Sequence, residues 1–317
     1  MNTITVKVAA IEQVTPLIKQ FTLVREDGQG FPAFSGGSHV VVVMEINGRT
    51  HRNAYSLMGS PENTSSYQIS VRRRERSRGG SMFMHEHVIE GTLLQMTLPV
   101  NLFQLSSERH KHILIAGGVG IAPFMSHLYE IERNGDQYEL HYAFRTPEHG
   151  AFREQLEARC GNHVCFYVDS LGRHLDIKAL LKARSPDHDV YVCGPSAMVT
   201  VVLETARELG WPDSQIHYEQ FTAPSMGEAF KVQLAKSGLE VEVACDVTLL
   251  EALETAGADP DSLCRSGACG RCELEVLELD GEIYHYDQYL SDAEKAAGRK
   301  ILPCVSRARC THMLLNI

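Results

Sequence analysis

The sequence predicts a multi-domain protein that combines a small antiparallel β-barrel, a doubly wound parallel sheet with helices, and a compact C-terminal domain. Three observations predict this fold class. Apolar runs separated by glycine turns fill residues 1–105, strands alternate with helical stretches over 106–223, and a cysteine-rich loop lies within 230–317. Residues 224–229 have the Pro/Ser/Gly composition of a linker. A chain of 317 residues has room for two or three compact units.

Composition and charge narrow the functional classes. The chain is 44% hydrophobic and 22% charged, which is ordinary for a globular protein. Its net charge of −10 argues against a nucleic-acid partner, because nucleic-acid binding depends on Lys and Arg. No apolar run reaches the ~18–20 residues that span a bilayer, and the N-terminus reads as a strand rather than as a signal peptide. We therefore expect a cytoplasmic protein with no membrane or nucleic-acid partner.

The sequence of the first domain predicts mainly β-strands. Apolar runs at Val40–Met44, Tyr67–Val71 and Leu93–Leu98 are separated by clusters of Gly, Ser and Asn, and Ser81–Val88 is the one short helical stretch. This pattern predicts a small antiparallel barrel or sandwich.

The second domain alternates strands and helices. Buried strands are predicted in residues 112–118, 138–144, 163–169, 189–195 and 216–221. Helices are predicted at Pro123–Glu132, Ala151–Arg159, Ile177–Ala183 and Ala197–Leu209. Strands that alternate with helices indicate βαβ units and a parallel sheet.

The C-terminal domain begins with a predicted hairpin, Phe230–Leu234 and Leu239–Val243, and a helix at Leu249–Thr255. Residues 230–317 contain 15 acidic and 9 basic residues. This acidic excess is either a solvated face or a docking surface for a basic partner.

The most specific motif is a cysteine loop in the C-terminal domain. Cys264, Cys269 and Cys272 follow the spacing C-x4-C-x2-C, and Cys304 lies far downstream. This is the plant-type ferredoxin spacing for a [2Fe–2S] cluster, whose two irons need four thiolates. The alternatives are a structural zinc site and four unrelated buried thiols. Zinc sites favour paired short C-x2–4-C motifs, and only one such motif is present here. The remaining cysteines outside the nucleotide motif are expected to be small core residues: Cys160, Cys165, Cys245 and Cys310.

Two motifs of the second domain indicate a nucleotide site. The turn Gly117-Gly118-Val119-Gly120-Ile121-Ala122-Pro123 follows a strand and opens a helix, where backbone N–H groups can hold a pyrophosphate. Cys193-Gly194-Pro195 ends a later strand, and the carboxyl ends of strands in doubly wound sheets converge on the ligand crevice. Alone, the glycine turn also fits simple tight packing, and Cys193-Gly194-Pro195 also fits a buried cysteine before a turn.

The predicted barrel contains two motifs that are weaker candidates for ligand binding. Tyr55 and Ser56 on one strand are suited to flank and hydrogen-bond a planar ring. Gly79-Gly80-Ser81 at a helix start is suited to a phosphate. The arginine run after Val71 reads as a solvated edge, and the fifteen histidines show no metal-ligand spacing.

In this order, the motifs resemble the phthalate dioxygenase reductase family, the reductase components of Rieske-type oxygenases, along essentially the whole chain. Within this family, the amino-acid sequences of the motifs are most similar to those of the carnitine monooxygenase reductase branch. The resemblance implies a flavin barrel, a nicotinamide domain and a C-terminal ferredoxin domain, with FMN, NADH and a [2Fe–2S] cluster as cofactors. It also implies flavin contacts by three groups of residues and one aromatic: Arg52, Asn53, Ala54, Tyr55 and Ser56; Ser70, Val71 and Arg72; Gly79, Gly80 and Ser81; and Phe221.

The same resemblance implies nicotinamide nucleotide contacts by Gly117, Gly118, Gly120, Ala122, Pro123, Cys193, Gly194 and Pro195. Two positions depart from the family pattern. Asn53 replaces the arginine of the flavin motif, with Arg52 one place earlier, so either residue is a candidate for the flavin phosphate. Ala122 replaces a common threonine.

The resemblance predicts an NADH-dependent oxidoreductase that passes electrons through FMN and the cluster to a Rieske-type oxygenase, for carnitine or an aromatic acid. Ser56 and Cys193 are the predicted catalytic residues, and the free protein is expected to be a monomer. The same electron path to a cytochrome P450 or a di-iron oxygenase is an alternative. A non-enzymatic redox sensor is a second alternative, but it would need a signalling or DNA-binding element that the sequence lacks.

Overall fold

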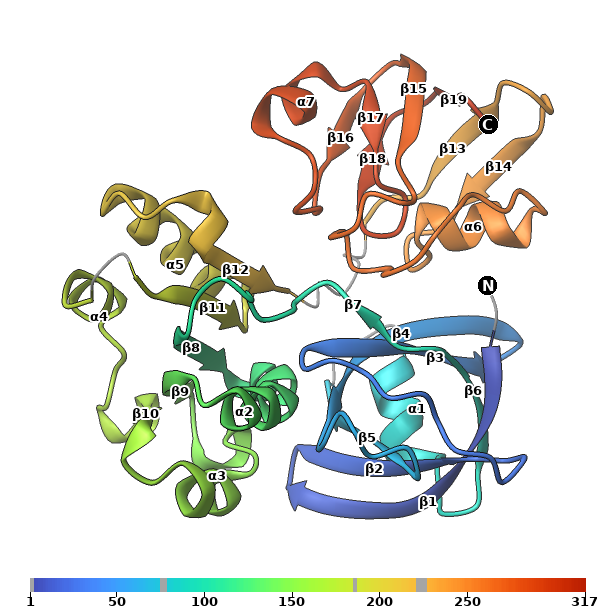
Figure 1. The fold of residues 1–317 in the computed structure, drawn as a ribbon. Coiled ribbons are helices and arrows are strands. Elements are labelled where there is room, and N and C mark those ends of the chain that lie inside the picture. The colour runs from blue at the N-terminus through green and yellow to red at the C-terminus, as the bar shows by residue number, and fades with distance from the viewer. Residues whose placement is uncertain (1–2, 75–78, 185–186, 221–226) are drawn as a thin grey trace. The chain divides into compact units, whose positions relative to one another are not determined.

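The computed structural model describes residues 3–74, 79–184, 187–220 and 227–317 (Figure 1). The packing of Cα atoms divides the chain after Gln220 into two compact units. The first unit contains a barrel and an α/β domain, and the second begins at Phe221 and contains the cysteine loop. Phe221 and residues 224–226 of the predicted linker lie outside the described residues.

The first domain is a closed antiparallel barrel with one helix, α1 (Gly80–Glu86). Its sheet has the order β4-β5-β2-β1-β6-β3-β7, and pairing of β3 with β4 closes the barrel. Branched and aromatic side chains such as Phe21, Val42 and Ile69 fill its core. Its strands are β1 (Thr3–Thr15), β2 (Ile18–Arg25), β3 (Ser38–Ile46), β4 (Arg49–Met58), β5 (Tyr67–Arg72), β6 (Leu93–Thr97) and β7 (Val100–Asn101).

The second domain is a five-stranded parallel sheet of order β10-β9-β8-β11-β12. The chain builds outward from β8 in one direction and then from β11 in the other, so the order reverses between these two strands. The strands are β8 (Lys111–Gly117), β9 (Gln137–Phe144), β10 (Val164–Val168), β11 (Asp189–Cys193) and β12 (Ile216–Glu219). The helices are α2 (Ala122–Asn134), α3 (Arg153–Cys160), α4 (Ile177–Lys182) and α5 (Ser196–Glu208).

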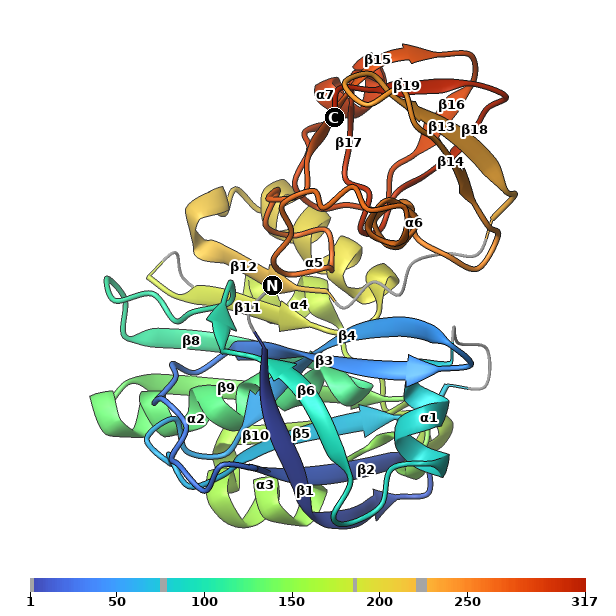
Figure 2. The same cartoon turned by 90° about the vertical axis from the view of Figure 1, so that its right-hand side faces the viewer.

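The helices lie on both faces of this sheet, as Figure 2 shows. Leu181 of α4 and Val202 of α5 pack against Ile115 and Val192 of the central strands. The doubly wound parallel sheet predicted from the sequence is therefore confirmed. Short 3-10 turns connect the elements at Gly118–Ile121, Pro147–His149, Gly161–His163, Asp169–Leu171 and Asp213–Gln215.

The second unit contains a mixed sheet of order β14-β13-β19-β15-β17 and a separate β16–β18 pair. Its first helix, α6 (Leu249–Thr255), begins with a capping box in which Thr248 and Glu251 bond each other's backbone N–H groups. The other helix is α7 (Asp292–Ala297). The strands are β13 (Phe230–Leu234), β14 (Glu240–Val243), β15 (Leu274–Leu279), β16 (Glu282–Tyr284), β17 (Lys300–Ile301), β18 (Arg307–Arg309) and β19 (Met313–Leu315).

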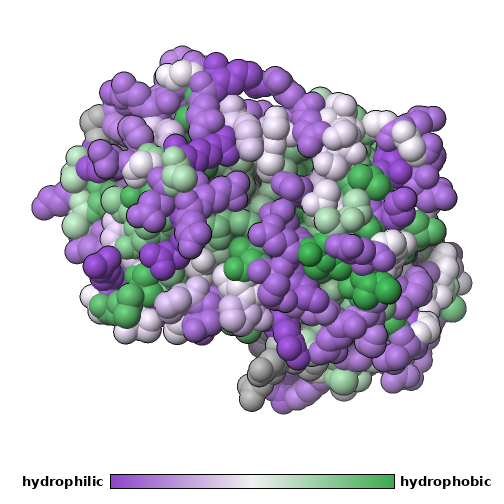
Figure 3. All heavy atoms as spheres, turned by 90° about the horizontal axis from the view of Figure 1, so that it is seen from below, coloured by the Kyte–Doolittle hydropathy of each residue, from purple (hydrophilic) through white to green (hydrophobic). Residues whose placement is uncertain are grey.

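All of β1–β7 precede residue 105, β8–β12 fall within 106–223, and β13 begins at residue 230. Among the described helices, none is long and apolar enough to cross a membrane. Figure 3 shows one face of the molecule, on which hydrophilic side chains predominate and hydrophobic ones are interspersed.

The expectation that four cysteines are core residues is wrong for two of them. Cys160 is buried and Cys310 is half-buried, but Cys165 and Cys245 are exposed. Cys165 lies on β10, the outermost strand of its sheet, and Cys245 lies in the turn between β14 and α6. An apolar residue type does not reveal that its strand is at an edge.

Candidate functional site

The four predicted metal ligands lie in the second unit as two pairs. Cys264, Cys269 and Cys272 occupy the loop between α6 and β15, and Cys304 follows β17. Cys264 and Cys269 each shift the pKa of the other, and so do Cys272 and Cys304, because the thiols of each pair lie close together. Cys264, Cys269, Cys272 and Cys304 would supply the four thiolates that a [2Fe–2S] cluster needs.

Backbone N–H groups of the loop support the charged form of these sulfurs. The N–H of Ser266 donates to Sγ of Cys264 at 3.5 Å, and the hydrogen bond from Cys269 contributes most to lowering the pKa of Cys264. Cys304 likewise holds the pKa of Cys272 below its usual value. Buried thiolates with N–H donors fit a [2Fe–2S] cluster. Within the described ranges, no three His, Cys, Asp or Glu side chains gather as for a single metal ion.

The nucleotide motifs meet where the strand order of the parallel sheet reverses. Gly117 ends β8 and Cys193 ends β11, and these strands are neighbours. A Cβ atom on Gly120 would overlap the carbonyl oxygen of Cys193, and one on Gly117 would lie 2.6 Å from Cδ of Pro195. The two loops therefore touch backbone to backbone, directly before the N-terminus of α2. Backbone N–H groups at such a switch point fit the diphosphate of a dinucleotide.

Cys193 lies beside a group of polar side chains that joins the barrel to the α/β domain. Glu219 ends β12 in register with Cys193, and the hydroxyl of Ser56 on β4 donates to its carboxylate at 3.4 Å. His39 of β3 has Nδ1 at 3.8 Å from the same carboxylate. Burial first, and then the charge of Glu219, raise the pKa of Cys193 well above its usual value. The two predicted catalytic residues thus approach the same carboxylate.

The sequence interpretation did not include Glu219 or His39. One signal was available for Glu219, a carboxylate at the carboxyl end of a predicted parallel strand, where ligand-binding groups gather. His39 had no comparable signal, because its importance depends on a barrel strand meeting a second domain.

These environments predict which thiols react. We expect Cys165 and Cys245 to be alkylated within minutes at pH 8, because their side chains are exposed. Cys193 should react only after unfolding, because it is 1% exposed and its raised pKa leaves it as the thiol. Mass spectrometry of alkylated peptides measures this order. Early labelling of Cys193 in the folded protein would contradict the buried position.

The barrel strand β4 presents its predicted flavin residues on two faces. Because side chains alternate along a strand, Asn53 and Tyr55 share one face, and Arg52 and Ala54 share the other. The amide of Asn53 donates to the hydroxyl of Tyr55 at 3.2 Å, and a Cβ on Gly80 would lie 2.5 Å from that amide nitrogen. Burial raises the pKa of Tyr55 to about 12, which keeps its hydroxyl neutral. Asn53, and not Arg52, thus stands between Tyr55 and the start of α1.

The neighbouring strand β5 holds buried polar atoms that need partners. Within the described part of the chain, Oγ of Ser70 and Nε of Arg72 are buried without a hydrogen-bond partner. Such atoms are costly unless a ligand satisfies them, so they fit a flavin. Because Leu57 pairs with Ile69, Ser70 and Arg72 share their face of the sheet with Ser56 and Ala54 of β4. Val71 points the other way, into the barrel core at 1% exposure, so only its backbone is available to a cofactor. Ser81 is buried, and its hydroxyl accepts from the N–H of Arg74 at 3.3 Å.

Positive charge gathers beyond the end of β5. Burial, Arg74 and Arg145 together lower the pKa of Arg72. Burial and the charges of Arg72 and Arg145 lower the pKa of His149. Like charges held together in this way favour an anionic ligand.

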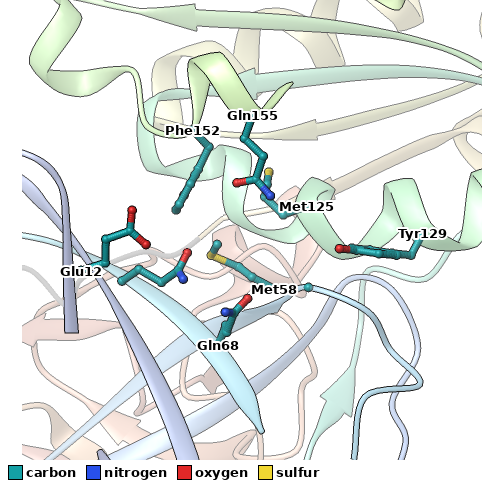
Figure 4. Close-up of a pocket in the computed structure, with 9 residues that line it drawn as sticks. Glu12, Met58, Gln68, Met125, Tyr129, Phe152 and Gln155 are labelled. Atoms are coloured by element: carbon teal, nitrogen blue, oxygen red, sulfur yellow. The ribbon is translucent and has the colours of Figure 1, made fainter. Parts of the chain in front are cut away.

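A separate cavity of about 250 Å³ lies between the barrel and the α/β domain (Figure 4). Met58 of β4 and Met125 of α2 approach it from the two domains, as the figure shows. The described lining contains no predicted cofactor residue: Glu12, Gln20, Met58, Gly59, Gln68, Met125, Tyr129, Phe152 and Gln155.

Two family models match the chain. An "Oxidoreductase NAD-binding domain" matches residues 114–204, and a "2Fe-2S iron-sulfur cluster binding domain" matches residues 232–309. The solved structure of phthalate dioxygenase reductase superposes with a TM-score of 0.86 at 30% identity, covering 100% of this chain and 98% of that one. The chain belongs to the phthalate dioxygenase reductase family.

Curated relatives place this reductase among oxygenase systems. A carnitine monooxygenase reductase subunit of Acinetobacter baumannii is 47% identical over 98% of this chain and 96% of its own length. A heme-dependent oxidative N-demethylase beta subunit of Ectopseudomonas mendocina is 41% identical over 98% of both chains. The reductase is an oxidoreductase that supplies electrons to an oxygenase, and its cofactors are FMN, NADH and a [2Fe–2S] cluster. The predicted fold class, enzyme class and cofactors are therefore confirmed.

Proposed function

We propose that this reductase takes hydride from NADH at the buried junction of Ser56, Cys193 and Glu219, and serves a Rieske-type oxygenase through Cys264, Cys269, Cys272 and Cys304. The observation that carries the proposal is the Ser56–Glu219 hydrogen bond beside Cys193. It brings a barrel strand, which offers a flavin face, to the switch point of the sheet, which offers a nucleotide site.

When bound, FMN accepts two electrons as hydride and releases them singly, and the cluster carries one electron at a time. The chain supplies binding and orientation. Ser70 and Arg72 on β5 would hold the flavin on the face that they share with Ser56 of β4, with Gly80 and Ser81 at the start of α1 and Asn53 and Tyr55 beside that start. Gly117–Pro123 and Cys193–Pro195 would hold the nicotinamide nucleotide.

At the junction, Glu219 accepts the proton of Ser56 in a hydrogen bond and so fixes the direction of the hydroxyl. Ser56 then has oxygen lone pairs left to accept from a cofactor N–H. Cys193 is neutral and buried, so it acts by shape and by excluding water from the reacting atoms. Glu219 is thus a positioning residue.

The test is transient kinetics of NADH oxidation by Glu219→Gln and Ser56→Ala proteins. We expect both to reduce the flavin roughly 10–100-fold more slowly, with a larger isotope effect from deuterated NADH, because misplacement of the reacting groups is costly. Glu208→Gln, on the exposed face of α5, is the control. Unchanged hydride transfer in both variants would remove these residues from the reaction.

A second prediction concerns the cationic group. We expect Arg145→Ala to raise the KM for NADH about tenfold with little change in kcat, because a diphosphate contact stabilises substrate and transition state equally. Any use of NADPH should fall further, because its additional phosphate prefers a nearby arginine. Steady-state kinetics with both nucleotides measure this. Arg133→Ala, exposed and paired with Glu62, is the matched control.

The oxygenase partner is of Rieske type in this proposal, and carnitine or an aromatic acid is its substrate class. The carnitine monooxygenase relative supports the first substrate. A heme-dependent acceptor is the second candidate, supported by the N-demethylase relative. Parallel reduction assays with both kinds of oxygenase separate the two. We further propose that the free reductase is monomeric and works in the cytoplasm, which light scattering and fractionation test.

A further inference from the structure

We infer that Tyr289 and Tyr286 form a docking surface for the oxygenase component beside the cluster loop, and that Tyr289 is its anchor. This inference rests on the proposed function, since it names where the oxygenase binds. The segment 285–290 supplies none of the four predicted cluster ligands, and the exposure of its two tyrosines has no role in the sites described above.

Tyr289 lies directly on the backbone that carries the cluster ligands. A Cβ on Gly270, which stands between Cys269 and Cys272, would overlap the ring of Tyr289. Gly270 also has a φ of +72°, so the loop presents bare backbone at this point. A protein that contacts Tyr289 therefore lies next to the loop that carries the predicted cluster ligands.

The ring is held in place although it faces solvent. Tyr289 is 52% exposed, whereas its neighbour Leu290 is 3% exposed and packs with Cys272 and Cys304. The N–H of Gln288 donates to the carbonyl of Gly267 at 3.0 Å, and the buried carboxylate of Asp287 accepts from the N–H of Leu290 at 2.9 Å. A fixed aromatic side chain loses little entropy on binding.

Aromatic exposure is concentrated in this segment. Tyr286 is 38% exposed, so two large amphipathic rings face solvent within four residues. Tyrosine is enriched at the energetic centres of protein interfaces, where its ring is buried and its hydroxyl stays paired.

The surrounding charge indicates what kind of partner fits. Residues 256–295 contain ten acidic and three basic residues. All three basic side chains are paired with carboxylates: Arg265 with Glu254, Arg271 with Asp261, and Lys295 with Asp287. The complementary partner surface is an apolar patch ringed by lysines and arginines. An oxygenase component with such a patch would be steered to the cluster electrostatically.

The test uses the full-length holoprotein, with the oxygenase subunit of the Acinetobacter baumannii carnitine monooxygenase as probe. We expect Tyr289→Ala to raise the KM for the oxygenase roughly 30-fold, as for an interface anchor. Tyr289→Phe should retain most of the affinity. NADH-to-ferricyanide turnover and the electron paramagnetic resonance spectrum of the cluster should not change in either variant.

Leu239→Ala is the matched control, because Leu239 is 40% exposed in the same unit and lies at the β13–β14 hairpin, the other edge of the sheet. Wild-type affinity in Tyr289→Ala overturns the docking surface. A cluster spectrum altered in both Tyr289 variants also overturns it, since the ring would then support the loop. Tyr286→Lys provides a second, independent substitution, and unchanged affinity there limits the surface to Tyr289. If the unsubstituted protein reduces its cluster but not the oxygenase, the proposed function fails instead.

Discussion

A Cys304→Ser protein should still oxidise NADH through its flavin but deliver electrons to an oxygenase at least about 100-fold more slowly. Cys304 lies beside Cys272 and would hold the cluster with it, so its loss would leave three thiolates where a [2Fe–2S] cluster needs four. Even residues that only support metal ligands cost ~10–100-fold when they are removed, so loss of a ligand should cost more. NADH-to-ferricyanide turnover and oxygenase reduction, measured on one preparation, separate the two half-reactions.

Cys310→Ser is the control for this substitution. Cys310 is a half-buried cysteine of the same unit, and no ligand spacing includes it. We expect its variant to keep the cluster, as measured by iron content and visible absorption. Normal oxygenase turnover in a folded Cys304→Ser protein would show that another group is the fourth ligand.

A Gly120→Ala protein should lose most of its activity with NADH. The added methyl group would overlap the backbone carbonyl of Cys193, and no side-chain rotation relieves that contact. The loop after β8 must then separate from the loop after β11, at a cost of about 1–3 kcal/mol in stability. Because both loops belong to the proposed nucleotide site, we expect kcat/KM for NADH to fall about 100-fold.

The matched control is Gly135→Ala at the other end of α2. Gly135 has a φ of +73° and open space around it, so this change costs backbone strain of about 1 kcal/mol but displaces no neighbour. Thermal unfolding and NADH kinetics of the two proteins separate steric displacement from general destabilisation. Equal losses in both would show that the close contact of the loops does not matter for the nucleotide.

Much of the fold followed from local patterns. The strands β8 and β11 are largely apolar runs, as expected for strands buried on both faces. The cysteine spacing was informative for the same reason, because three ligands lie within one short loop. The strands β15–β19 were not predicted. β16–β19 have only two or three residues each, and the pairing of all five strands is set by the tertiary fold.

Less of the candidate site than of the fold could be predicted from the sequence. Ser56 and Cys193 were named, but their common partner, Glu219, depends on β4 meeting β12 across a domain boundary. Val71 is the opposite case, a residue that the sequence motif named but whose side chain does not face the site. Its motif marked it as a cofactor neighbour, whereas strand alternation directs its side chain into the core. Sequence motifs locate the backbone at a site, and only the fold decides which side chains face it.

The two cysteine pairs also have a consequence for the stability of the C-terminal unit. Cys272 and Cys304 are 32 positions apart, and one iron bound by both would close the intervening chain into a loop. A covalent link across a loop of that length removes denatured-state entropy worth about 4 kcal/mol. The cluster would thus act as a cross-link that stabilises the unit, as a disulfide does in small exported domains. Unlike a disulfide, it would leave no cystine for thiol reductants to cleave.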